Sequence, residues 1–192
     1  MPRLVLASTS TFRRELLAKL QIPFETAAPD CDEAALTGEL PKETAERLAY
    51  AKASSIATDF PNSLIIGSDQ VAFVGTQVFG KPGTKIVATK QLADMRGREV
   101  VFHTGLCLLN TATSEAQRAG ISTAVKFRNL TDAEIERYLQ REDALNCAGS
   151  AKSEGLGIAL LDYISGDDPN ALVGLPLIAL CAMLRQEGIS VP

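Results

Sequence analysis

The sequence contains a single histidine, His103, among 192 residues. Any mechanism that needs two histidines is therefore excluded, which removes the HExxH metalloproteases and zinc sites built on several histidines. The chain also has few cysteines, and no two of them have CxxC spacing, so it carries neither a zinc ribbon nor a thioredoxin-type motif. We expect the four thiols to be reduced and structural, as is usual in the cytosol. They are Cys31, Cys107, Cys147 and Cys181.

Long apolar runs and an excess of positive charge are missing as well. The first apolar run covers only residues 4–7, shorter than the roughly 7–15 residues of a signal peptide. No stretch approaches the roughly 20 apolar residues of a membrane span, so we expect a cytoplasmic protein used at full length. Lys and Arg total 19 against 23 Asp and Glu, a net charge of -4. This balance argues against long nucleic acids and membrane surfaces as partners, but it allows a local basic site.

The overall composition is typical of a globular domain. Hydrophobic residues make up 46% and charged residues 22%, enough apolar material for a full core. No repeat or long linker divides the chain, so we expect one domain over residues 1–192, with two lobes around a cleft allowed.

Hydrophobic patterning and capping residues predict alternating strands and helices. Because the middle of the chain has the pattern of a long hairpin, the fold class is mixed α/β: a twisted mixed sheet flanked by helices. The predicted strands are 3–7, 64–67, 71–79 with a turn at Gly75, 100–109, 122–127 and 158–161. The predicted helices are 12–20, one beginning at Pro41, 84–95, one beginning with the capping box at 131–134, and a last one that stops at Gly188.

Two glycine motifs are rejected. Residues 75–81 match the GxxxxGK of a P-loop, but Pro82 stands where the Ser or Thr that holds magnesium is required. Gly155 and Gly157 begin a GxG, but the third glycine of a dinucleotide-binding turn is missing.

The N-terminal segment is a candidate phosphate site. A buried strand leads into hydroxyl residues at 8–10, and the following helix opens with Arg13 and Arg14. Helix N-termini offer free N–H groups to phosphate, and arginines add forked, charge-assisted hydrogen bonds. Arginines at this end oppose the helix dipole, a cost that a bound anion would offset, although a solvated pair is the alternative.

Carboxylates and lysines elsewhere could complete such a site. Asp69 follows an apolar strand, where a carboxylate can bind a hard cation or accept a proton from water, the alternative being an ordinary turn residue. Glu33, next to Asp32, is a weaker second carboxylate. Lys52 lies on the apolar face of its helix, so its ammonium either extends to solvent or meets an anion. With Lys81 and Lys152 it could surround a polyphosphate.

Five ordered motifs together resemble the Maf family of nucleoside triphosphate pyrophosphatases, and they extend over nearly the whole chain. They are Leu-Ala-Ser-Thr-Ser at 6–10 with Arg13-Arg14, Ile-Gly-Ser-Asp at 66–69, Gly-Lys-Pro at 80–82, Cys-Ala-Gly-Ser at 147–150 with Lys-Ser-Glu-Gly at 152–155, and Gly-Leu-Pro at 174–176.

The resemblance implies a cytoplasmic hydrolase that cuts a nucleoside triphosphate to its monophosphate and diphosphate with a divalent metal, Mg²⁺ or Mn²⁺. It implies an elongated two-lobed fold with a central cleft, similar to the inosine triphosphate pyrophosphatases, and it is compatible with a homodimer. Asp69 falls on the position of the proposed general base, and binding of the metal beside Glu33 is a competing role for the same carboxylate. The positions that line the phosphate and metal site are Ser8, Arg13, Glu33, Lys52 and Lys81.

Three positions distinguish the branches of the family. Relatives acting on thymidine and uridine triphosphates carry Arg, Thr and Gln where this chain has Phe12, Gln70 and Glu154. The set found here resembles the branch acting on 7-methyl-GTP, which often has Trp at the position of Phe12. An aromatic ring attracts the cationic methylated base, and a carboxylate adds opposite charge. The alternatives are a pyrophosphatase for other canonical or modified nucleotides and a non-catalytic nucleotide-binding regulator of cell division.

Overall fold

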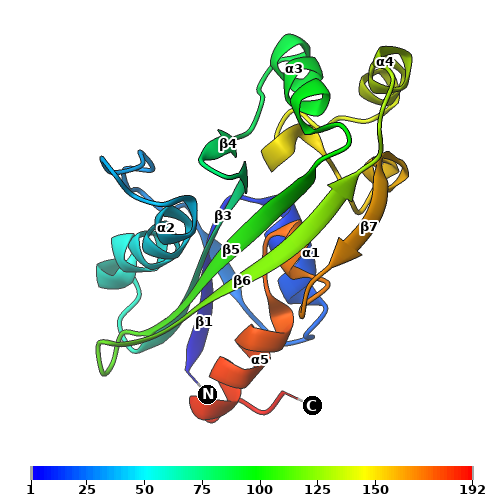
Figure 1. Ribbon diagram of the computed structural model, residues 1–192. Coiled ribbons are helices and arrows are strands. Elements are labelled where there is room, and N and C mark those ends of the chain that lie inside the picture. Colours follow the sequence, from blue (N-terminus) through cyan, green and yellow to red (C-terminus); the bar gives the residue numbers. More distant parts are fainter. Residues whose placement is uncertain (1, 192) are drawn as a thin grey trace.

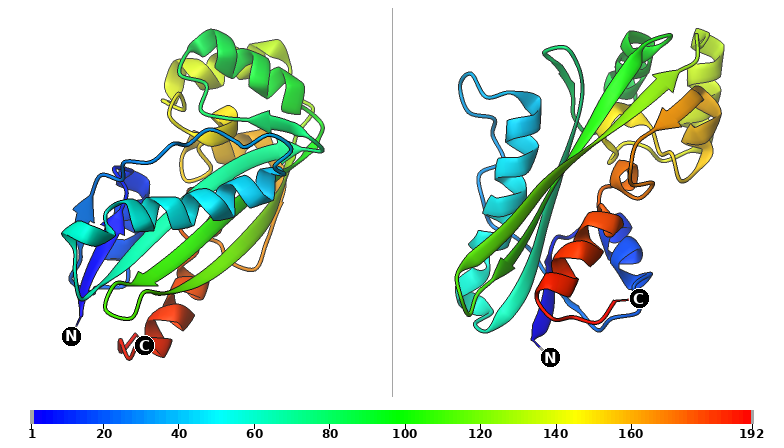
Figure 2. Two further views of the ribbon diagram at one scale, coloured as in Figure 1. Left: turned by 90° about the vertical axis from the view of Figure 1, so that its left-hand side faces the viewer. Right: turned by 60° about the horizontal axis from the view of Figure 1, so that its bottom comes forward.

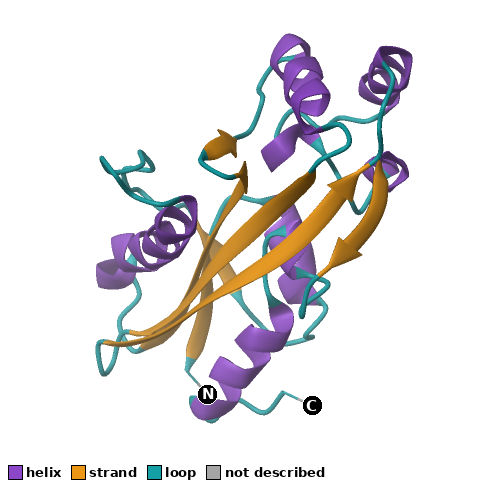
Figure 3. Cartoon of the chain, viewed as in Figure 1, coloured by secondary structure: helices purple, strands orange, loops and turns teal. Residues whose placement is uncertain are grey.

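The computed structural model, which describes residues 2–191, contains one seven-stranded mixed sheet with helices on both faces (Figures 1 and 3). The strands are β1 (Arg3–Ala7), β2 (Glu25–Ala27), β3 (Ser63–Val74), β4 (Gln77–Phe79), β5 (Glu99–Asn110), β6 (Glu115–Phe127) and β7 (Leu161–Ser165). The α-helices are α1 (Thr11–Ala18), α2 (Pro41–Ser55), α3 (Lys85–Met95), α4 (Asp132–Arg141) and α5 (Leu177–Gln186). Short 3-10 helices are η1 (Ala57–Asp59), η2 (Ala148–Ser150), η3 (Leu156–Leu160) and η4 (Ala171–Val173).

The strand order is β2-β1-β3-β5-β6-β7, with β4 paired to β3. Strand β1 runs parallel to β2 and β3, whereas the pairs β3–β5, β5–β6 and β6–β7 are antiparallel. The mixed α/β fold class is therefore confirmed, and so is the hairpin, which is β5 and β6. Its second strand is longer than predicted and begins at Glu115. The first half of this strand was missed because it is largely polar or small and has no buried side chain, so it lacks the apolar alternation that marks a strand.

Successive side chains of the central strands point to opposite faces of the sheet and pack into different hydrophobic cores. On one face Leu6, Ile66 and Leu108 pack against α1 and α5. On the other face Val5 and Ile65 pack against α2. Figure 2 shows α2 on one side of the sheet and α5 with α1 on the other.

The far end of the sheet has a core of its own. Phe102 and Phe127 pack there with residues of α3 and α4, away from α1, α2 and α5. Because β3, β5 and β6 run through both ends, the molecule is elongated, with one group of helices at each end (Figure 1). No helix among residues 2–191 is long and apolar enough to cross a membrane.

Two local predictions are wrong. Residues 158–161 are not a strand: η3 covers most of them and β7 starts only at Leu161, because the main chain around Gly157 folds back on the carbonyl of Lys152. Asp69 does not follow a strand either. It lies inside β3, which continues to Val74 because β5 pairs with it from Leu64 to Phe73.

Two glycines bring α2 unusually close to the sheet. A Cβ on Gly67 would lie 2.0 Å from the carbonyl oxygen of Ala49, and one on Gly105 would lie 2.4 Å from that of Ala45. Both positions therefore require glycine, since a real Cβ atom would not approach a carbonyl oxygen so closely. Because Asp69 pairs with Gly105 in the sheet, this close packing places α2 directly over Asp69.

Candidate active site

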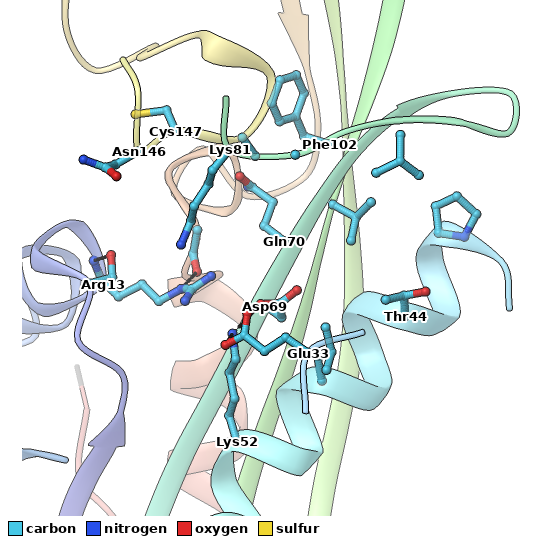
Figure 4. Close-up of a pocket in the computed structure, with 18 of the residues that line it drawn as sticks. Arg13, Glu33, Thr44, Lys52, Asp69, Gln70, Lys81, Phe102, Asn146 and Cys147 are labelled. Carbon is cyan, nitrogen blue, oxygen red and sulfur yellow. Dashed lines mark hydrogen bonds and ion pairs between the residues drawn. The ribbon is translucent and has the colours of Figure 1, made fainter. Parts of the chain in front are cut away.

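A cavity of about 900 Å³ opens between the two ends of the molecule (Figure 4). Its walls come from the start of α1, the loop before α2, α2 itself, the middle of β3, the segment 146–154 and the turn 172–174. Segments distant in the sequence therefore meet in one hollow, as predicted for a central cleft.

What we call the charged end of the cavity consists of four side chains: Lys52 with its two partners Asp69 and Glu33, and Arg13. The ammonium Nζ of Lys52 lies 2.6 Å from Oδ1 of Asp69 and 3.0 Å from Oε1 of Glu33. Lys52 is 5% exposed and Asp69 is 9% exposed, whereas Glu33 reaches in from an exposed loop. Lys52 thus meets anions, one of the two outcomes foreseen for a lysine on an apolar helix face, and Figure 4 shows the three side chains together.

Arg13 enters the cavity from the first turn of α1, whose N-cap is Ser10. Its Nε donates a hydrogen bond to the carbonyl of Gly174 at 2.8 Å. Burial lowers the pKa of Arg13, and the charges of Asp69 and Glu33 oppose that shift. Ser8 also lines the cavity, and its hydroxyl oxygen accepts a hydrogen bond from the main chain of Ser10 at 3.1 Å.

Two of the predicted cations do not reach the cavity. Arg14 is exposed and is absent from the described cavity wall, because the next residue on a helix points about 100° away from Arg13. Lys152 instead pairs with Glu142 at 3.0 Å. The predicted phosphate role of Arg14 therefore has no support in the geometry. The predicted cations that line the cavity are Arg13, Lys52 and Lys81, of which Lys81 is exposed.

The opposite side of the cavity, which we call the apolar end, is lined by Phe102, Cys147 and Leu172. Burial raises the pKa of the Cys147 thiol to about 11, so this thiol is protonated at neutral pH. The sequence did not single out Phe102 or Leu172, and it marks Cys147 only as a thiol and as the first residue of a family motif. The Cys-Ala-Gly-Ser motif was the only signal near them, and it carries no indication of a cavity wall.

The three branch-distinguishing residues also line the cavity: Phe12, Gln70 and Glu154. Lys152 Nζ lies 5.8 Å from the centroid of the Phe12 ring, within the range of a cation–π contact. The Phe12 ring is thus already in contact with a cation, and Glu154 lies close in sequence to that cation on an exposed loop.

A metal would have to be held by few protein groups. Among residues 2–191 no three His, Cys, Asp or Glu side chains are grouped to hold an ion. Asp69 and Glu33 nevertheless lie close enough to share one ammonium. Mg²⁺ typically binds one or two carboxylates and takes its other ligands from substrate phosphates and water. The two carboxylates fit a cation of that kind.

Known proteins are similar to this chain in sequence over nearly its whole length. The family model described as Maf-like protein matches residues 3–187. A 7-methyl-GTP pyrophosphatase of Aromatoleum aromaticum is 56% identical over 190 residues, which are 99% of this chain and 98% of that protein. One of Methylobacillus flagellatus is 56% identical over 191 residues, covering 100% of both. The solved structure of the Staphylococcus aureus Ham1 protein superposes with a TM-score of 0.47 at 16% identity, over 66% of this chain and 72% of that one.

Proposed function

The chain belongs to the Maf family, and on that premise we propose that it hydrolyses 7-methyl-GTP to 7-methyl-GMP and diphosphate. Two proteins that carry the name of this activity match it at 56% identity over essentially their whole length. The observation that carries the proposal is the nearly buried Asp69, paired with Lys52 in the wall of a cavity that also holds Arg13 and Lys81.

Asp69 orients a water molecule and accepts its proton. The water oxygen forms a bond to the α-phosphorus, and the bond from that phosphorus to the α,β-bridging oxygen breaks, so that diphosphate leaves. The ion pair with Lys52 holds one carboxylate oxygen at 2.6 Å and leaves the other for the water. Arg13 and Lys81 neutralise the charge that grows on the leaving diphosphate.

Asp69 and Glu33 would hold the divalent cation, Mg²⁺ or Mn²⁺, which when bound supplies positive charge to the phosphate oxygens. Lys52 already holds both carboxylates in place without the cation. Both residues would therefore serve as metal ligands. Asp69 would also accept the water proton, and these two roles compete for its carboxylate.

Phe12, Gln70 and Glu154 recognise the base. The ring of Phe12 attracts the positive charge that N7-methylation places on guanine. The carboxylate of Glu154 adds opposite charge and can accept from N1–H and N2–H of guanine together. These roles rest on the positions of the residues in the cavity and on the resemblance to the branch acting on 7-methyl-GTP.

The test is release of diphosphate from a panel of 7-methyl-GTP, GTP, UTP and dTTP with Mg²⁺ or Mn²⁺. The wild type should prefer 7-methyl-GTP, and Asp69→Asn should lose roughly 100- to 10,000-fold in kcat, the usual range for a general base. Asp59→Asn is the matched control, because Asp59 is exposed in η1 and absent from the described cavity wall. Unchanged turnover in Asp69→Asn would overturn the mechanism. A different preferred nucleotide would overturn the substrate, and tight binding without turnover would favour the regulator.

We also propose that residues 1–192 form a single Maf-like domain, because β3, β5 and β6 run through both ends of the molecule. A cytoplasmic location, a homodimer, and the exclusion of long nucleic acids and membranes as partners stay predictions from the sequence.

A further inference from the structure

The carbonyl groups of residues 171–174, which we call the acceptor turn, take hydrogen bonds from two cavity residues and from two buried residues behind them. The carbonyl of Ala171 accepts from Gln70 Nε2 at 2.9 Å and from Thr104 Oγ1 at 2.8 Å. The carbonyl of Gly174 accepts from Arg13 Nε at 2.8 Å and from Ser68 Oγ at 2.9 Å. One short turn is thus attached to both a phosphate-side cation and a base-side amide.

The bonds to Gln70 fix which end of its amide faces the cavity. Thr104 donates its only hydroxyl proton to Ala171, so its oxygen accepts from Gln70 Nε2 at 2.9 Å. Leu172 adds a further carbonyl acceptor at 3.0 Å. With acceptors on every partner of this amide, its NH₂ group must point to the turn. Oε1 of Gln70 has no hydrogen-bond partner among residues 2–191, so the atom left for a ligand is an acceptor.

The bonds to Gly174 fix the direction of Arg13. Ser68 is fully buried, and its hydroxyl lies 2.9 Å from the carbonyls of both Gly174 and Gly105, so it ties the turn to the sheet. Gly174 has φ +114°, a conformation that favours glycine, and a Cβ at this position would lie 3.5 Å from Nε of Arg13. With Nε held there, both NH₂ groups of the guanidinium stay available for an anion.

We propose that the acceptor turn is the positioning element of the cavity, with Ser68 and Thr104 as its buried positioning residues. Through Gly174, Ser68 sets the direction of Arg13 at the phosphates. Through Ala171, Thr104 keeps Gln70 an acceptor, which favours a base edge rich in N–H donors such as guanine. This inference deepens the proposed function and rests on it for the identity of the substrate.

The two residues should have separable effects. Ser68→Ala should weaken the binding of inorganic diphosphate about tenfold and lower kcat/KM equally for every nucleotide, since a buried hydrogen bond is lost behind Arg13. Thr104→Val should leave diphosphate binding unchanged. It should lower the kcat/KM ratio of 7-methyl-GTP to ATP about tenfold, because Gln70 Nε2 loses one of its three acceptors and the less firmly held amide can turn its NH₂ group to N1 of adenine. Thr104→Ser should restore the ratio.

The chain offers matched controls. Ser63 is buried in the same strand as Ser68 and donates to a loop carbonyl outside the described cavity wall. Thr123 is buried, and its hydroxyl has no partner in the part of the chain that the structure describes. Ser63→Ala and Thr123→Val should change neither diphosphate binding nor the nucleotide ratio. Thr104→Ala is the second variant to use where Thr104→Val does not fold.

The proposal is overturned if Thr104→Val and Thr104→Ala keep the wild-type ratio, or if Ser68→Ala alters the ratio as much as it alters diphosphate binding. Should the wild type release no diphosphate from any nucleotide, the proposed function fails by itself. Calorimetry then tests the positioning roles from the binding of diphosphate, 7-methyl-GMP and AMP to the same variants. Ser68→Ala should weaken diphosphate binding without changing the ratio of the 7-methyl-GMP and AMP affinities, and Thr104→Val should lower that ratio without changing diphosphate binding.

Discussion

The charged end and the apolar end of the cavity are built in different ways. At the charged end, Lys52 and Asp69 come from the middle of a long helix and a long strand, held together at a distance that only Gly67 and Gly105 permit. At the apolar end, Phe102 comes from β5, but Cys147 comes from a loop and Leu172 from the short helix η4, and the neighbouring Glu154 also lies on a loop. The ion pair of Lys52 and Asp69 thus lies on regular elements, which position side chains precisely, whereas Glu154 lies on an exposed loop of the kind that tolerates change.

Removing the central ion pair should have the largest effect on stability. Lys52→Met leaves Asp69 nearly buried without its partner and should lower the free energy of unfolding by about 3 kcal/mol. Asp69→Asn should cost less, because Lys52 keeps Glu33. Urea unfolding measures both.

The control for this pair is Lys42→Met, an exposed lysine of the same helix. It should change the free energy of unfolding by no more than about 0.5 kcal/mol, as surface substitutions usually do. Equal stabilities of Lys52→Met and Lys42→Met would show that the charged end is not held by its ion pair.

Moving the helix away from the sheet should disturb the charged end alone. Gly67→Ala places a Cβ 2.0 Å from the carbonyl of Ala49, so α2 must shift, at a cost of about 1–3 kcal/mol. Turnover should fall for all nucleotides alike, since Lys52 moves with α2 while the apolar end stays. Urea unfolding and the nucleotide panel measure the two effects.

Gly80→Ala is the matched control for stability, because a Cβ there meets no atom within 4 Å. A Gly67→Ala variant as stable as Gly80→Ala would contradict the close approach of α2.

Changing the base-selecting residues should alter preference with little change in stability. Glu154→Gln together with Phe12→Arg removes a negative charge and an aromatic face and adds a cation, so preference for 7-methyl-GTP over UTP should fall about tenfold or more. The kcat/KM ratio of the two substrates is the measurement. Glu15→Gln, on the exposed side of α1, is the control. A preserved ratio in the double variant would contradict the assignment of these residues.

The smallest effect concerns the environment of the apolar end. Because burial raises the pKa of Cys147 to about 11, its thiolate fraction at pH 8 is only about 0.1%. Alkylation of Cys147 by iodoacetamide should therefore be slow at pH 8 and rise about tenfold for each pH unit up to 10. Mass spectrometry of the Cys147 peptide follows it, with urea-unfolded protein as the reference. Equal rates in folded and unfolded protein would show that the apolar end is open to water.

Residues of the candidate site could be predicted from the sequence where the local pattern leaves a side chain only one or two possible environments. A lysine on an apolar helix face must find an anion or reach solvent, and Lys52 finds Asp69. Arg13 and Arg14 are equivalent in sequence, yet only Arg13 lines the cavity, because the helix phase relative to the sheet separates them. The strand expected at 158–161 failed because apolar residues in a tight 3-10 turn share the pattern of a short strand.

The mixed α/β class, the hairpin, most helix starts and the types of side chain that bind phosphate could all be predicted from the sequence. These follow from periodicity, caps and charge, which act over a few residues. The packing of distant segments, by contrast, places Asp69 within a strand beneath α2, pairs Lys152 with Glu142, and brings the carbonyls of residues 171–174 to Arg13 and Gln70. The physical reason is that main-chain carbonyls are the same at every residue, so which of them meets a given side chain depends on how distant segments pack.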